Sequence, residues 1–174
     1  MSDKPEVWQR GPLPDIHPVL QPIAHALLQA REEIPIYMKG YPQVLLWSHL
    51  AGLASPGFHL QHLSGVLDRT FTYARGESLT PAQFEQLHEE GNDSEAGYTI
   101  EELLDRFSSQ VDKAILQLKN TDPATFGDYR AIGRAGLPST VIGLMVHAAE
   151  HTMRHVGQLL VTTGVLKGGH NLGY

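Results

Sequence analysis

The sequence predicts an all-α protein, a four-helix bundle that forms a single domain over residues 1–174. Four long segments carry apolar residues at helical spacing, and segments rich in glycine and proline separate them. No alternating strand pattern persists along the chain. With 174 residues, of which 41% are hydrophobic, the chain is long enough to bury a core without cross-links. We expect the core helices at about residues 16–38, 57–75, 99–119 and 139–165.

The first two helices have recognisable boundaries. Pro22 is expected to delay or bend the start of the first helix, and Gly40 and Pro42 end its apolar pattern. Ser55 supplies a hydroxyl cap for the second helix, and Pro56 occupies the first helical position, where its missing N–H is not needed. The second helix should therefore begin directly after Ser55.

An acidic connection over residues 76–98 follows, and Thr80 with Pro81 predicts one short helix inside it. The third long helix begins with Thr99 and Glu102, which fit the capping box. In that motif the side chain of each residue bonds to the backbone N–H of the other. An apolar stripe then continues to about residue 119.

Residues 120–138 contain several glycines and prolines and are expected to form a loop. Ser139 then caps the last helix, which is apolar over most of its circumference. Such a helix is buried on several sides, which favours contact with a partner subunit as well as with the bundle.

Composition and charge exclude several classes of function. The chain has no cysteine, so thiolate metal sites, disulfides and cysteine nucleophiles are excluded. The net charge of −6 argues against nucleic-acid binding, which needs a basic face. The N-terminal residues show no signal peptide, and no segment is apolar enough to span a membrane. We therefore expect a cytoplasmic protein with no nucleic-acid or membrane partner.

The last helix carries three of the chain's 10 histidines at intervals of four, His147, His151 and His155. Residues four apart lie on one side of a helix with Cβ atoms about 6 Å apart, which lets two imidazoles bind one metal ion. Three histidines in this register occur by chance in only about 3% of such chains. Apolar or small residues continue the side of His151 and His155, so this side is expected to face the bundle core.

The second helix offers a third ligand. His62 shares a face with Phe58 and Arg69, and an inward orientation of that face would bring it to His151 and His155. His59, the other histidine of this helix, is the competing candidate for the third ligand, although we expect it to be exposed to solvent. Three neutral imidazoles leave a metal coordination position open for water or substrate, which is the catalytic arrangement.

Two segments carry a family resemblance, HLSGVLDRTFTYARGE in the second helix and AEHTMRHVGQ in the last. Together with the predicted bundle they resemble the DinB/YfiT-like metalloenzyme superfamily, from about residue 17 to 165. The resemblance implies an up-down-down-up bundle, a homodimer, and one divalent metal ion, nickel or zinc. It implies His62, His151 and His155 as the ligands. His147 lies one turn outside this triad.

Characterised relatives include thiol-dependent S-transferases and a thiol-dependent isomerase. The resemblance therefore implies transfer of a low-molecular-weight thiol to a small-molecule substrate. Metal-dependent hydrolysis is one alternative, because a metal can also generate hydroxide from water. A non-catalytic metal-binding bundle in the stress response is the other.

Three further residues are candidates for catalytic roles, Glu150, Asp68 and Arg154. Each also has a plainer interpretation. We expect Asp68 to form an ion pair with Arg69, and Glu150 to be exposed to solvent. Arg154, Arg69 and Tyr73 would contact an anionic substrate if they faced the pocket.

Overall fold

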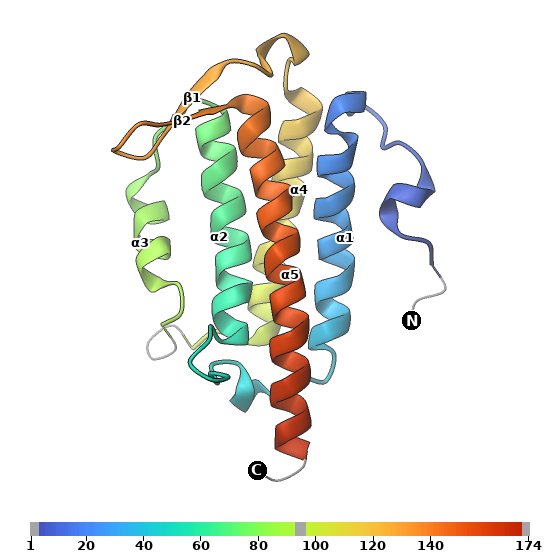
Figure 1. Cartoon of the computed structure of the whole chain (residues 1–174), viewed down its shortest axis with the longest axis vertical. Coiled ribbons are helices and arrows are strands. Elements are labelled where there is room, and N and C mark those ends of the chain that lie inside the picture. Colours follow the sequence, from blue (N-terminus) through green and yellow to red (C-terminus); the bar gives the residue numbers. More distant parts are fainter. Residues whose placement is uncertain (1–3, 93–96, 172–174) are drawn as a thin grey trace.

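A computed structural model describes residues 4–92 and 97–171 (Figure 1). The predicted domain 1–174 and the predicted connection 76–98 each include residues outside this range. The long helices are α1 (Gln21–Met38), α2 (Pro56–Ala74), α4 (Ile100–Asn120) and α5 (Val141–Asn171). Both α4 and α5 pack against α1 and α2. In Figure 1, α1 and α5 run from top to bottom, and α2 and α4 run from bottom to top. None of the described helices is long and apolar enough to cross a membrane.

Helix α1 begins at residue 21 rather than at about 16. Pro18 opens a short 3₁₀ turn, Pro18–Leu20, and Nδ1 of His17 accepts a hydrogen bond from the backbone N–H of Val19. Pro22 lies in the first turn of α1, where its missing N–H is tolerated. The delay expected from Pro22 is therefore confirmed.

The predicted starts of α2 and α4 are confirmed. The Ser55 hydroxyl accepts a hydrogen bond from the N–H of Phe58 at 3.1 Å. At α4, the Thr99 hydroxyl accepts from the N–H of Glu102, and the Thr99 N–H donates to the Glu102 carboxylate at 2.8 Å. These bonds satisfy N–H groups that the first turn of a helix leaves free.

The short helix expected after Thr80 is α3, Pro81–Glu89. It lies outside the bundle beside α2 (Figure 1). Gln83 attaches it there, because its amide nitrogen donates to Asp68 at 2.7 Å and to Thr72 at 2.9 Å. This attachment also fixes the residues that directly follow α3.

The predicted loop over residues 120–138 is wrong in part, because a hairpin of two antiparallel strands lies there. Strand β1 (Tyr129–Ile132) pairs with β2 (Leu137–Thr140), so the all-α prediction holds for the main body but misses this small sheet. Ser139 belongs to β2 and does not cap the last helix. Instead the Thr140 hydroxyl accepts from the N–H of Gly143 at 3.0 Å, and α5 then extends beyond residue 165.

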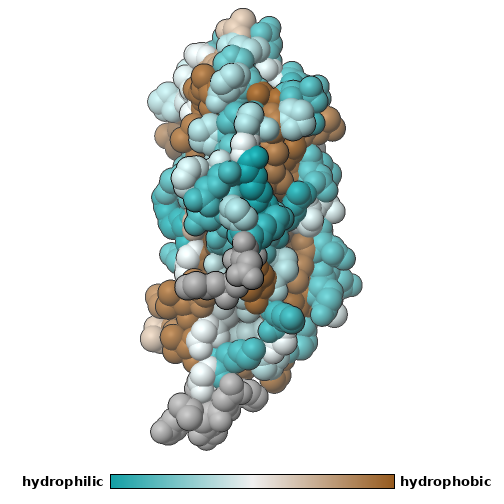
Figure 2. Space-filling model, turned by 90° about the vertical axis from the view of Figure 1, so that its right-hand side faces the viewer, coloured by the Kyte–Doolittle hydropathy of each residue, from teal (hydrophilic) through white to brown (hydrophobic). Residues whose placement is uncertain are grey.

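The hydrophobic core lies between the four long helices. On α5, the apolar residues that continue the side of His151 and His155 are buried, namely Leu144, Ala148 and Leu159. Figure 2 shows the face on the α1 side, where hydrophilic residues cover much of the surface between separate hydrophobic patches. The core contains large side chains that are fully enclosed, among them Leu27, Leu63, Leu67, Leu103 and Phe107.

Candidate metal centre

Helices α2 and α5 pack against each other and bring the predicted histidines together. The Nε2 atoms of His62 and His151 lie 2.9 Å apart. The ring centroid of His155 lies 4.6 Å from that of His62 and 4.6 Å from that of His151. Each of the three residues offers one nitrogen, and these nitrogens all lie within 4.8 Å of one another. We call these three residues the histidine cluster.

His147, the first histidine of the series on α5, does not join the cluster. Its side chain is 53% exposed, and its Nδ1 lies 3.7 Å from a carboxylate oxygen of Glu150. An α-helix turns 100° per residue, so the side chain of His147, eight positions before His155, is rotated by about 80° from that of His155. Helix α2 therefore meets the neighbouring pair His151 and His155 on α5, and His147 points away from it toward solvent.

His59 is buried, so the prediction that it is exposed to solvent is wrong. It is 4% exposed, and its Nδ1 lies 2.9 Å from Nδ1 of His155. The first turns of α2 pack against α5, so His59 is enclosed between these helices. One of the two Nδ1 atoms carries the shared proton. With its Nδ1 occupied by His59, His155 has its Nε2 left for a metal ion.

Glu90 is not among the residues predicted from the sequence. It lies directly after α3, and its side chain is only 7% exposed. Its carboxylate accepts a hydrogen bond from Nδ1 of His62 at 2.6 Å and another from Arg69 at 2.6 Å. A proton held on Nδ1 leaves the lone pair of Nε2 facing His151. Histidine ligands of metal ions commonly have such a carboxylate partner on the other nitrogen.

The site for Glu90 depends on a glycine. A Cβ atom at Gly65 would lie 2.3 Å from Oε1 of Glu90 and 2.6 Å from Arg69. Gln61 adds a second attachment, because its side-chain oxygen accepts from the N–H of Gly91 at 2.8 Å. Glu90 is one of several glutamates in an acidic segment, and no spacing in the sequence distinguishes it from the others.

Burial lowers the pKa of three histidines at the site, His59, His151 and His155. It lowers the pKa of His155 to about 3, with a further lowering from the neighbouring imidazoles. It lowers the pKa of His59 to about 4 and also lowers that of His151. For Glu90, burial acts to raise the pKa, but the hydrogen bonds from His62 and Arg69 outweigh it and lower the pKa. Neutral imidazole is the form that binds a metal ion.

The donor set fits a divalent metal ion. Nδ1 of His151 is buried and has no hydrogen-bond partner among the described residues. Its ring lies against the neighbouring imidazoles of His62, His147 and His155. Two ligand nitrogens of a tetrahedral ion lie about 3.3 Å apart, since each is about 2.0–2.1 Å from the metal. The 2.9 Å separation of His62 and His151 is close to that value.

The other candidates are not members of the histidine cluster. Glu150 is exposed, as expected, and forms an ion pair with Arg154. The expected pair between Asp68 and Arg69 is not observed, because Arg69 bonds to Glu90 instead. Asp68 accepts from Gln83 and from Gln110.

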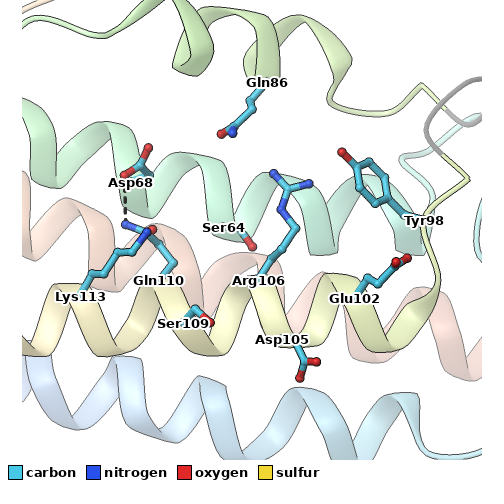
Figure 3. Close-up of a pocket in the computed structure, with 10 residues that line it drawn as sticks. All are labelled: Ser64, Asp68, Gln86, Tyr98, Glu102, Asp105, Arg106, Ser109, Gln110 and Lys113. Atoms are coloured by element: carbon cyan, nitrogen blue, oxygen red, sulfur yellow. Dashed lines mark hydrogen bonds between the residues drawn. The ribbon is translucent and has the colours of Figure 1, made fainter.

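Asp68 lines a separate cavity of about 530 Å³. Figure 3 shows this cavity between α2, α3 and α4, with the Asp68 carboxylate directed toward Gln110. Arg154 lines another cavity, which also includes His155. Tyr73 lines a third cavity, beside the hairpin, together with Arg130. Of the candidate residues outside the histidine cluster, Arg154 is thus the one that shares a cavity with a cluster member.

Comparisons with known proteins agree with this architecture. The crystal structure of a protein from Streptococcus pneumoniae, determined by a structural genomics consortium, has a similar fold with a TM-score of 0.61. The two chains share 12% sequence identity, and the match covers 84% of this chain and 88% of that one. No curated protein matches the sequence. The family model of the DinB superfamily matches residues 26–159, and the chain belongs to that superfamily.

Proposed function

We propose that this protein is a metal-dependent enzyme that holds one divalent ion, nickel or zinc, through His62, His151 and His155. We further propose that it transfers a low-molecular-weight thiol to a small electrophile. The observation that carries the proposal is the convergence of three imidazole nitrogens within 4.8 Å. When bound at three such ligands, a divalent ion has an open position at which it lowers the pKa of a thiol or of water.

The residues around the cluster support this role by orienting its rings. Glu90 holds the proton of His62 on Nδ1, and His59 bonds to Nδ1 of His155. The ring of Phe58 stacks on His62 with an angle of 12° between the planes. Ligands that are already oriented lose less conformational freedom when the ion binds.

The proposed reaction is a substitution. A bond forms between the thiol sulfur and an electrophilic carbon, and the leaving group departs with the electron pair of its bond to that carbon. The thiol proton passes to water. We also propose that the four long helices form the up-down-down-up bundle expected for the superfamily, which is supported by the helix directions in Figure 1.

The first test is the metal content of the full chain, purified without an affinity tag or added metal and then titrated with Ni²⁺ and Zn²⁺. We expect one ion per chain, lost in the double variant His151→Ala/His155→Ala and bound at least 100-fold more weakly in His62→Ala. His147→Ala is the matched control, since it removes an exposed histidine from the same helix. Absence of binding after titration, or equal loss in the control, would refute the proposed site.

The second test separates the reactions. We expect the metal-loaded protein to consume a low-molecular-weight thiol in the presence of 1-chloro-2,4-dinitrobenzene and to lose this activity in His62→Ala. Hydrolysis of a nitrophenyl ester without thiol, in place of thiol transfer, would identify a hydrolase. A protein that binds metal but catalyses neither reaction with a broad set of substrates would be a non-catalytic metal-binding bundle.

A further inference from the structure

A cavity of about 620 Å³ opens beside the histidine cluster. Its walls come from the connection after α1, from the first turns of α2 and from the middle of α5, and they include both His59 and His155. Cavities of about 300–1,000 Å³ are typical of small-molecule sites. Because His155 belongs to the histidine cluster, a molecule in this cavity lies next to the proposed metal position.

One wall is a tight turn held in an uncommon conformation. The N–H of Leu53 donates to the carbonyl of Leu50 at 2.8 Å, and between them Ala51 and Gly52 have φ angles of +50° and +75°. Alanine rarely adopts a positive φ, because its Cβ atom crowds the backbone. His49 adds a bond from its ring to the Leu53 carbonyl at 2.8 Å. This turn places Leu50 and Leu53 along the cavity.

The segment before the turn is attached to α2. Gly57 allows the Trp47 ring to lie against the helix, since a Cβ atom at Gly57 would be 2.4 Å from that ring. The N–H of Gly57 also donates to the carbonyl of Leu46 at 2.7 Å. The wall therefore rests on fixed contacts with the same helix that carries His59 and His62.

The cavity is mostly apolar. Most of the surface that its lining exposes is apolar, and five of the lining residues are Leu50, Leu53, Ala54, Phe58 and Val161. Two of them, Leu53 and Val161, are 61% and 63% exposed, so large apolar side chains are held in water at its edge. An apolar ligand that covers this surface removes it from water, which contributes favourably to the free energy of binding. The Arg154 guanidinium, the charged group of this lining, is paired with Glu150.

We propose that this cavity binds the apolar part of the electrophile, an uncharged aryl or branched alkyl group, and so directs the reacting carbon toward His155. This inference rests on the proposed function and adds the substrate class to it. An ionised group is disfavoured in the cavity, because most of the lining surface is apolar and the Arg154 guanidinium is already paired with Glu150. The thiol then approaches from outside this cavity.

The test is fluorescence titration of the full chain with N-phenyl-1-naphthylamine, an uncharged aryl probe, both after chelation and after metal loading. We expect one site per chain in both states. Val161→Asn should weaken probe binding about tenfold, because an amide replaces apolar contact surface. Val165→Asn is the matched control, since Val165 is 50% exposed on the same helix and does not line the cavity. The control should bind within twofold of the unmodified chain.

Metal titration of the same variants separates this inference from the proposed function. Both valine variants should keep full metal stoichiometry, because neither residue belongs to the histidine cluster. Metal binding without probe binding, or equal probe affinity in the two valine variants, would overturn the apolar cavity and leave the metal site. Probe binding without metal binding would overturn the proposed function and, with it, the assignment of the cavity to its substrate.

Competition identifies which substrate the cavity holds. In the metal-loaded protein, the probe should raise the KM for the electrophile and leave the KM for the thiol unchanged. The reverse pattern would show that the cavity holds the thiol, and it would refute the inference.

Discussion

Replacing Glu90 with glutamine removes the negative charge that orients His62, and the size of the side chain hardly changes. The amide oxygen of glutamine is expected to accept from Arg69, because the NH₂ group would be repelled by the guanidinium. The NH₂ group then faces Nδ1 of His62, and an imidazole nitrogen that accepts a hydrogen bond carries no proton. The proton of a neutral His62 ring therefore moves to Nε2, the nitrogen that faces His151.

The expected losses follow from these contacts. A metal ion must displace the Nε2 proton, and loss of such an orienting partner typically weakens metal binding 10–100-fold, or about 1.4–2.8 kcal/mol. Stability should also fall, because the Arg69 charge is left in a site where its side chain is only 10% exposed. We expect a decrease of about 2–4 kcal/mol in the free energy of unfolding of the metal-free protein.

Three measurements test this prediction. Competition with a chelator gives the Zn²⁺ affinity, urea unfolding in the presence of chelator gives the stability, and ¹⁵N NMR of the imidazoles gives the tautomer of His62. Glu89→Gln is the matched control, because it changes the adjacent, exposed glutamate. A Glu90→Gln variant with the affinity of this control and an unchanged His62 tautomer would refute the orienting role of Glu90.

Three other predictions concern stability and ionisation. Gly65→Ala should lower the free energy of unfolding by about 1–3 kcal/mol, since its Cβ atom displaces Glu90, and urea unfolding would measure the loss. Hydrogen bonds from Arg10, and from a lysine, lower the pKa of Glu32 to about 2. The contribution of Glu32 to the free energy of unfolding should therefore be present above pH 4.5 and be lost as the pH falls toward 2. Because the pair is at the surface, Glu32→Gln should cost about 0.5 kcal/mol at pH 6 and nothing near pH 2; a pH-independent difference would contradict this assignment. Burial raises the pKa of Tyr41 to about 12, so the contribution of Tyr41 to the free energy of unfolding is complete below pH 10 and is lost as the pH rises toward 12. Absorbance at 295 nm, which measures tyrosine ionisation, should show one fewer tyrosine titrating at high pH in Tyr41→Phe.

The parts of the site that lie on helices were predictable from the sequence. His151 and His155 are four residues apart, and this spacing alone places them on one side of α5. The capping residues Ser55 and Thr99 fixed the starts of two helices for the same reason, because each acts on N–H groups within its own first turn. Local periodicity and local hydrogen bonds determine these features.

The parts that were missed depend on contacts between distant segments. Glu90 is 28 residues from His62, and it meets that ring because Gln83 and Gln61 attach α3 and its following residues to α2. His59 is buried because α5 covers it, which its own helix does not reveal. The sequence does not predict the hairpin, because its strands have only four residues each and contain little apolar alternation.

The charges around the cluster bear on its chemistry. The three imidazoles are neutral as ligands, and Glu90, the buried carboxylate that bonds to His62, is paired with the Arg69 guanidinium. Glu90 therefore fixes the orientation of His62 without giving the site a net negative charge. A divalent ion bound by neutral ligands keeps its full charge, whereas carboxylate ligands would neutralise part of it. The ion then acts more strongly on the pKa of a thiol or water at its open position, so Arg69 contributes to the proposed reaction by compensating the residue that orients a ligand.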